Sequence, residues 1–242
     1  ALGAIVLAAG SRPPFTAGFI AGAAVMLGCA VFFARLPRTD ESPDGTRPTR
    51  PRLLLALRDR RFMGITGLAT ILQLTMPILS VLLPVWIAER TNAPTWVAAA
   101  LLGFNTVLVM CFQTTVAARA RTAKSAARTA GVAAGCLAVA CLLIGLSALA
   151  ALTPVTATLV LIVGVLALTL GEMCAGAASW RAAFDTIPPG ADGQYQAVFG
   201  MASSGARILG PALALPLILL AGLAGWGILA AAVALSAVVL GI

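Results

Sequence analysis

Long apolar stretches separated by short polar segments make up most of the chain. Each long stretch matches the roughly 20 residues that an α-helix needs to cross a bilayer. The pattern predicts seven full crossings, at 15–35, 62–87, 95–117, 129–151, 154–179, 196–221 and 225–242. Residues 1–10 are apolar but too short to span, so we expect them to end a helix whose beginning is missing. The sequence predicts an all-α, polytopic membrane bundle and a chain that is a fragment.

The composition excludes a soluble protein. Hydrophobic residues make up 60% of the 242 positions and charged residues 10%, whereas soluble domains are about 45–50% apolar and about 25% charged. The chain has no histidine, so it lacks the commonest general base and metal ligand. The five cysteines all lie inside apolar runs without a CxxC pattern. We therefore expect no disulfide framework, no metal site and no cofactor.

Basic residues fall in alternate loops, which gives the expected orientation. Arg35 and the segment 36–61 carry eight of them, 118–128 carries four and 180–195 carries one, against two in the opposite loops. Positively charged loops stay on the cytoplasmic side, so we expect these segments in the cytoplasm and the protein in the plasma membrane. The net charge of +8 is spread over loops and forms no folded patch, so we expect no nucleic-acid partner.

Residues 36–61 interrupt the apolar pattern and predict a polar linker between two bundles. Leu53–Leu57 near its end have two interpretations, a short amphipathic helix on the membrane surface or a solvated hinge. The hinge is the favoured interpretation. The predicted organisation is one helix end and one full helix in 1–35, the linker at 36–61, and a six-helix bundle at 62–242.

Strongly polar side chains enter four of the spans, whereas the interiors of 15–35, 129–151 and 225–242 hold nothing stronger than serine or threonine. Such groups are costly in hydrocarbon and usually face a cavity or a partner. The spacing predicts a bundle in which two of every three helices line a polar path and the third faces lipid. The candidate residues of this path are Gln73, Asn105, Gln113, Glu172, Ser203 and Arg207.

Glu172 and Arg207 are the two charged candidates, at expected depths of roughly 12 and 16 Å from the cytoplasmic helix ends at 1.5 Å per residue. They form either a permanent ion pair that fixes helix packing, or a site where Glu172 exchanges a proton and Arg207 influences it or meets an anionic group. Gln73 and Asn105 are either substrate contacts or interhelical hydrogen-bond partners. Pro77 and Pro84 lie on the polar face of their span and predict bends.

Several stretches together resemble the major facilitator superfamily, and in particular its drug/proton antiporter-like branch. They are Leu83–Trp86, Gly103–Asn105 followed by Gln113, Gly171–Met173, and Gly193 through Pro211. The resemblance assigns 62–242 to the C-terminal six-helix half of that fold, and 1–35 to the end of the fifth helix and all of the sixth.

The same resemblance implies two bundles that rock about a midplane site, with helices three, six, nine and twelve outside the cavity. The antiporter Gly-Pro motif of the fifth helix would precede Ala1. The equivalent place in the eleventh helix holds Gly205, Gly210 and Pro211. The basic loop at 119–128 occupies the position of a family loop motif but lacks its Gly and Asp.

The leading hypothesis is alternating-access transport of a small organic molecule, as proton-coupled efflux of a drug or metabolite. Its partners would be the substrate, H+, the lipid bilayer and the missing N-terminal half of the same transporter. The alternative is a membrane-embedded protein that does not transport, either a channel or assembly partner or a lipid-modifying enzyme. An enzyme is disfavoured because the chain has no paired carboxylates and no GxSxG motif, so we expect no catalytic residues.

Overall fold

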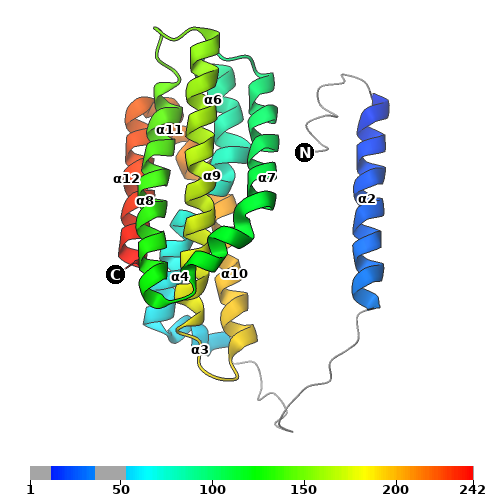
Figure 1. Cartoon of the computed structure of the whole chain (residues 1–242), viewed down its shortest axis with the longest axis vertical. Coiled ribbons are helices and arrows are strands. Elements are labelled where there is room, and N and C mark those ends of the chain that lie inside the picture. Colours follow the sequence, from blue (N-terminus) through cyan, green and yellow to red (C-terminus); the bar gives the residue numbers. More distant parts are fainter. Residues whose placement is uncertain (1–11, 36–52, 242) are drawn as a thin grey trace. The chain divides into compact units, whose positions relative to one another are not determined.

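The computed structural model describes residues 12–35 and 53–241 of the chain. Every regular element within these ranges is helical (Figure 1). The predicted helix end at 1–10 and the greater part of the predicted linker, 36–52, lie outside the described residues. Over the described part, the prediction of an all-α membrane protein is confirmed.

The chain divides into two units, Ala1–Pro51 and Arg52–Ile242, with the boundary inside the predicted linker. The described part of the first unit is one helix, α2 (Arg12–Ala34), which begins three residues before the predicted span. Its apolar stretch Gly18–Phe32 is a shorter candidate than the spans of the second unit.

Six helical stretches of the second unit are long and apolar enough to cross a membrane. They correspond one to one with the six crossings predicted for this part of the chain, although several ends differ. Their bounds are Arg60–Arg90, Trp96–Ala120, Ala123–Leu146, Pro154–Phe184, Asp192–Ala221 and Leu223–Leu240.

Four of the stretches are built from single helices or end in a short 3-10 turn. The continuous helices are α8 (Ala123–Leu146), α9 (Pro154–Phe184) and α12 (Leu223–Leu240), and α7 (Trp96–Ala117) ends in the turn η2 (Ala118–Ala120). The other two stretches are interrupted by π-helical segments. They consist of α4 (Arg60–Leu72), α5 (Thr75–Pro77), η1 (Ile78–Leu82) and α6 (Leu83–Arg90), and of α10 (Asp192–Leu209), η3 (Gly210–Ala214) and α11 (Leu215–Ala221).

Two tryptophans pack against each other in the core of the second unit. Trp86 and Trp226 are fully buried, with their rings edge to face and centroids 5.6 Å apart. The indole Nε1 of Trp86 donates a hydrogen bond to the Ile144 carbonyl at 2.9 Å, which ties α6 to α8 as well as to α12.

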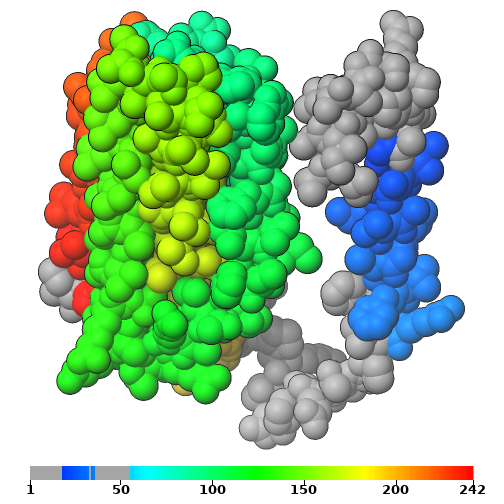
Figure 2. All heavy atoms as spheres, turned by 45° about the horizontal axis from the view of Figure 1, so that its top comes forward, coloured from blue at the N-terminus to red at the C-terminus, as the bar shows by residue number. Residues whose placement is uncertain are grey.

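One outer face of the second unit is formed by α12, α8, α9 and α7 in a row (Figure 2). Large apolar side chains on these helices are exposed, among them Val132, Leu159 and Leu235, which is 65% exposed. A continuous apolar surface of this kind is what a helix bundle presents to lipid.

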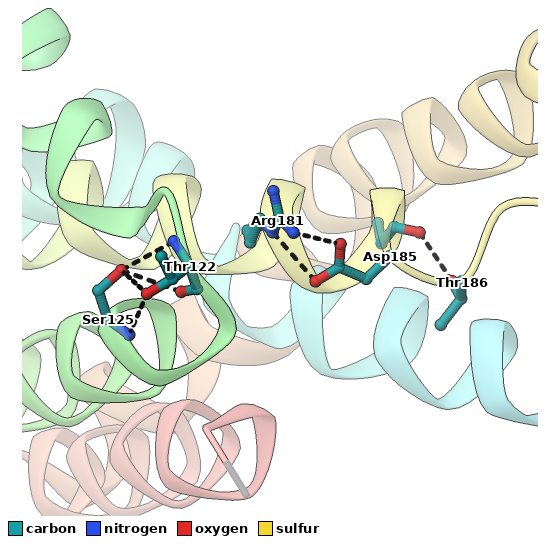
Figure 3. Close-up of polar contacts among 6 residues, drawn as sticks. Thr122, Ser125, Arg181, Asp185 and Thr186 are labelled. Atoms are coloured by element: carbon teal, nitrogen blue, oxygen red, sulfur yellow. Dashed lines mark hydrogen bonds and ion pairs between the residues drawn. The ribbon is translucent and has the colours of Figure 1, made fainter.

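The N-terminus of α8 lies six residues before the predicted start of its span at 129. Thr122 and Ser125 form a capping box, in which the Thr122 hydroxyl accepts from the Ser125 amide at 3.2 Å (Figure 3). The predicted basic loop at 118–128 is therefore a short turn, and Lys124 and Arg128 lie in the first two turns of α8. The pattern of apolar residues did not predict that α8 begins at Ala123. A capping box provides hydrogen-bond acceptors for the first amides of a helix and needs no apolar residues.

The predicted loop at 180–195 is also shorter than expected. α9 continues to Phe184 and α10 begins at Asp192, so the connection spans only 185–191. Arg181 and Asp185 extend α9 past the apolar region with an i, i+4 ion pair, whose shortest N–O distance is 2.7 Å (Figure 3). The helix α9 therefore continues beyond the end of the hydrophobic stretch.

The favoured hinge interpretation is wrong for the end of the linker. Residues Leu53–Arg58 form the helix α3, and its Ala56 is fully buried in a cluster with Phe62 of α4 and Tyr195 of α10. Asp59 then caps α4, since one oxygen of its carboxylate accepts hydrogen bonds from the backbone amides of Arg61 and Phe62. Its other oxygen accepts a hydrogen bond from the Tyr195 hydroxyl at 3.3 Å.

Candidate functional site

Two open clefts lie side by side in the second unit and share Glu172 and Met76 in their walls. Cleft A has a volume of about 560 Å³ and is bounded by residues of α4, α5, α7, α9 and α10. Cleft B has a volume of about 420 Å³ and reaches the two π-helical stretches. Neither α8 nor α12 contributes a residue to these two clefts, and these are two of the helices without strong polar groups.

Glu172 is held by a small polar cluster between α7 and α9. Asn105 Nδ2 donates to Thr169 Oγ1 at 2.9 Å and approaches Glu172 Oε2 at 3.5 Å. Thr169 and Glu172 are three residues apart on α9 and so lie on one face. The Thr169 hydroxyl donates its hydrogen to the Val165 carbonyl at 2.7 Å. Its oxygen can therefore accept a hydrogen bond from the side-chain amide of Asn105. Each group has a defined donor or acceptor role in this arrangement.

The Glu172 carboxylate consequently lies at the boundary between cleft A and cleft B. Asn105 is 8% exposed and lines cleft B but not cleft A, whereas Glu172 lines both. A carboxylate in this position can meet water or a ligand from either cleft while a neutral amide orients it from α7.

Of the two interpretations of Glu172 and Arg207, the permanent ion pair does not form. Among the described residues, Arg181–Asp185 is the only ion pair within 4.0 Å. Arg207 is exposed on α10 and lines cleft B together with Glu172, and α4 packs against both α9 and α10.

Both charged residues lie farther from the ends of their helices than expected, because the helices extend beyond the predicted apolar spans. Glu172 lies twelve residues before the end of α9, and Arg207 lies fifteen residues after the start of α10. At 1.5 Å per residue these are roughly 18 and 22 Å. Both are near the middle of their spans.

The remaining predicted site residues divide between the clefts and their surroundings. Gln73 and Gln113 line cleft A together with Glu172. Ser203 is half-buried on α10 and is not among the residues that line cleft A or cleft B. The structure thus brings together five of the six predicted side chains, around a shared Glu172.

The two interrupted stretches meet beside cleft B. Pro77 immediately precedes η1, and Gly210 opens η3 with Pro211 behind it. A Cβ on Gly210 would overlap the Pro77 ring, lying 2.9 Å from its Cβ and closer still to its Cγ. Glycine is therefore required for these two segments to approach. At Pro77, where the sequence predicted a bend, the α-helix gives way to the π-helical segment η1.

The other motif residues are less constrained. A Cβ on Gly205 would meet Thr70 Cγ2 at 3.6 Å, an ordinary contact. Pro84 occupies the first turn of α6, directly after the π-helical segment η1.

Sequence reasoning missed several residues of cleft A, among them Thr75, Val109 and Trp180. Thr75 follows a break in the helix at Gln73 and Leu74, and its hydroxyl donates to the Leu72 carbonyl at 3.1 Å. The polar face of this span was predicted by assuming 100° per residue throughout. This assumption fails across the break, so Thr75 was not placed on the predicted polar face. The proline at 77 was the signal that the register would change.

The described residues contain no group of three or more Cys, Asp, Glu or His side chains placed to hold a metal ion. The walls of clefts A and B offer instead one carboxylate, two guanidiniums (Arg181 in cleft A and Arg207 in cleft B) and several neutral amides and hydroxyls. These groups can bind polar and charged parts of an organic molecule and exchange a proton, and they include no arrangement of nucleophile and base.

A family model described as the Major Facilitator Superfamily matches residues 1–211, most of the chain. No curated protein and no solved structure matches the chain.

Proposed function

This chain belongs to the major facilitator superfamily, and from that premise we propose that it exports a small organic molecule across the plasma membrane in exchange for protons. Membership makes it a multi-pass membrane transporter rather than an enzyme. The drug/proton antiporter-like activity, its direction and its proton coupling are the proposal.

The observation that best supports the proposal is the position and the hydrogen bonding of Glu172. It is an ionisable side chain near the middle of a spanning helix, it lines both clefts, and it has a neutral amide as its hydrogen-bond partner. Ionisable groups at this depth are costly and mark ion or substrate pathways. A structural carboxylate would be expected to hold a permanent cationic partner, and none of the described residues supplies one within 4.0 Å.

Proton exchange at Glu172 would change its hydrogen bond with Asn105. The ionised carboxylate only accepts, so it suits the Asn105 amide hydrogen, whereas the protonated acid brings a donor of its own. Protonation would thus loosen the link between α7 and α9, which is a link between two walls of the clefts. This couples the state of the proton to the shape of the site.

The other cleft residues would bind substrate. Gln73 and Gln113 present neutral amides in cleft A, and Arg207 presents an exposed guanidinium in cleft B. Because both clefts are open on one side, alternating access requires a second bundle to close over them. We propose that the N-terminal half of the same transporter supplies that bundle.

Transport by the complete protein in proteoliposomes tests the role of Glu172. With ethidium as a fluorescent probe, an imposed pH gradient should drive accumulation in the wild type. Glu172→Gln should abolish this gradient-driven accumulation while exchange of ethidium down its own gradient continues. Glu89→Gln, at an exposed glutamate near the end of α6, is the matched control and should behave as wild type.

The outcomes are separable. Full gradient-driven accumulation in Glu172→Gln would remove Glu172 from proton coupling. If the wild type moves ethidium without any response to the pH gradient, the antiport proposal itself fails and the chain remains a transporter of another kind.

A further inference from the structure

A third cleft lies at the end of the second unit that carries the Arg181–Asp185 pair. Cleft C has a volume of about 260 Å³, and it is walled by residues of α4, α8, α9 and α12. With the exception of Arg181, none of its lining residues belongs to cleft A or cleft B. It opens beside α8 and α12, the helices that take no part in those clefts.

The walls of cleft C are apolar. Small side chains on facing helices leave the space, while longer aliphatic ones border it. The alanines are Ala123, Ala126, Ala127, Ala178 and Ala182, and the larger residues are Ile65, Leu68, Val239 and Leu240. The end of α12 closes one side, since a Cβ on Gly241 would lie 3.1 Å from the Ala127 carbonyl oxygen. The hollow is an apolar slot between helices.

The rim of cleft C is cationic. Arg61, exposed in the first turn of α4, and Arg181 of α9 both line it, with one carboxylate, Asp185. Asp185 accepts from Nε of Arg181 at 3.0 Å and pairs with its Nη2 at 2.7 Å (Figure 3). A guanidinium has five hydrogens to donate, so donors remain on Arg181. With Arg61 unpaired by any carboxylate among the described residues, the rim keeps a net positive charge.

We propose that cleft C binds an anionic phospholipid, with its phosphate between Arg61 and Arg181 and one acyl chain along the apolar slot. A basic rim above an apolar slot between spanning helices matches both parts of such a lipid. A free phosphate would leave the slot empty, and a neutral lipid would leave the rim charge unused. Lys124 and Arg128 in the first turns of α8 add positive charge at the same end. The proposal is independent of the substrate and of proton coupling.

Lipid binding to the purified protein in detergent, followed by native mass spectrometry, tests the site. Phosphatidylglycerol should bind more tightly than phosphatidylcholine with the same acyl chains. Arg61→Gln should weaken phosphatidylglycerol binding about fivefold, the usual contribution of one basic residue at a membrane surface. Phosphatidylcholine binding should not change.

Three further variants have three different expected effects on lipid binding. Arg121→Gln removes a basic residue that does not line cleft C and should leave both affinities unchanged. Asp185→Asn removes the carboxylate that competes with phosphate for Arg181 and should strengthen phosphatidylglycerol binding. Ala182→Leu should fill the slot and weaken both lipids together.

Three results would overturn the proposal. Equal affinity for the two lipids in the wild type would show that the rim charge is not used. An equal loss in Arg61→Gln and Arg121→Gln would reduce the effect to general surface charge. Displacement of phosphatidylglycerol by an equimolar amount of inorganic phosphate would assign the site to the anion alone. Unaltered thermal unfolding of Arg61→Gln, whose side chain is exposed, confirms that the variant is folded.

Discussion

The helices around clefts A and B and the pair α8 and α12 are built differently, although all are apolar enough to span a membrane. The first and fifth spans of the second unit are interrupted by η1 and η3, and polar side chains gather where the interruptions meet. α8 and α12 are continuous, pack closely on each other, and carry no strong polar group within the bilayer-length stretch. Irregular backbone at membrane depth is tolerated where it lines a cavity. The contrast indicates that one side of the unit is built for a site and the other for stability and lipid contact.

The largest effect is expected where the two interrupted spans touch. Gly210→Ala places a methyl group into the Pro77 ring, and overpacking of this kind costs about 1–3 kcal/mol. We expect this loss in the unfolding free energy, with transport reduced as well because the segments beside cleft B must move apart. Chemical unfolding in detergent measures the first effect.

The matched control lies on the continuous side. Gly227 of α12 has nothing within 4 Å of the place its Cβ would occupy. Gly227→Ala should therefore be neutral, or slightly stabilising because alanine favours the helix. Equal destabilisation by the two changes would contradict the close approach of η1 and η3.

A somewhat smaller effect is expected from Trp86→Phe. The change removes the hydrogen bond from Nε1 to the Ile144 carbonyl at 2.9 Å and leaves that buried carbonyl without this donor. A loss of about 0.5–1.5 kcal/mol in the unfolding free energy follows, because the Ser147 hydroxyl still donates to the same carbonyl at 2.6 Å. Because Trp86 lines neither cleft A nor cleft B, transport per folded molecule should stay at the wild-type rate. A lowered rate at unchanged stability would place Trp86 in the mechanism and weaken the contrast.

The smallest effect on stability is expected within the polar cluster. Interhelical hydrogen bonds in membranes contribute about 0.6 kcal/mol on average. A double-mutant cycle of Asn105→Ala and Thr169→Val should give a coupling energy of that size, since the two side chains are 2.9 Å apart. Thr106→Val serves as control, because its hydroxyl donates only to the Leu102 carbonyl of its own helix.

The cluster should matter more for transport than for stability. Asn105→Ala is expected to lower proton-coupled transport at least tenfold, because it removes the donor that orients Glu172. A loss of transport no greater than that of Thr106→Val would make Asn105 a packing residue only.

The sequence pattern predicted the spanning helices and most of the polar residues of the clefts, because the cost of burying polar groups in hydrocarbon acts on composition directly. It could not predict helix ends such as Ala123, where a cap and not apolarity decides. It also missed α3, because the burial of Ala56 depends on Phe62 and on Tyr195, far along the chain. The Glu172–Arg207 ion pair does not form, and nothing in the linear order indicates that α4 packs against both α9 and α10.

The central claim is that the polar side chains face a water-filled cavity while α8 and α12 face lipid. Single cysteines at Arg207 and at Leu235, introduced into the complete protein after its native cysteines are replaced, test it directly. Arg207→Cys should react rapidly with a charged, water-soluble methanethiosulfonate reagent, and Leu235→Cys, which is exposed on α12, should react only with a lipid-soluble maleimide. The reverse pattern, with the cysteine at 207 accessible only from lipid, would contradict the account.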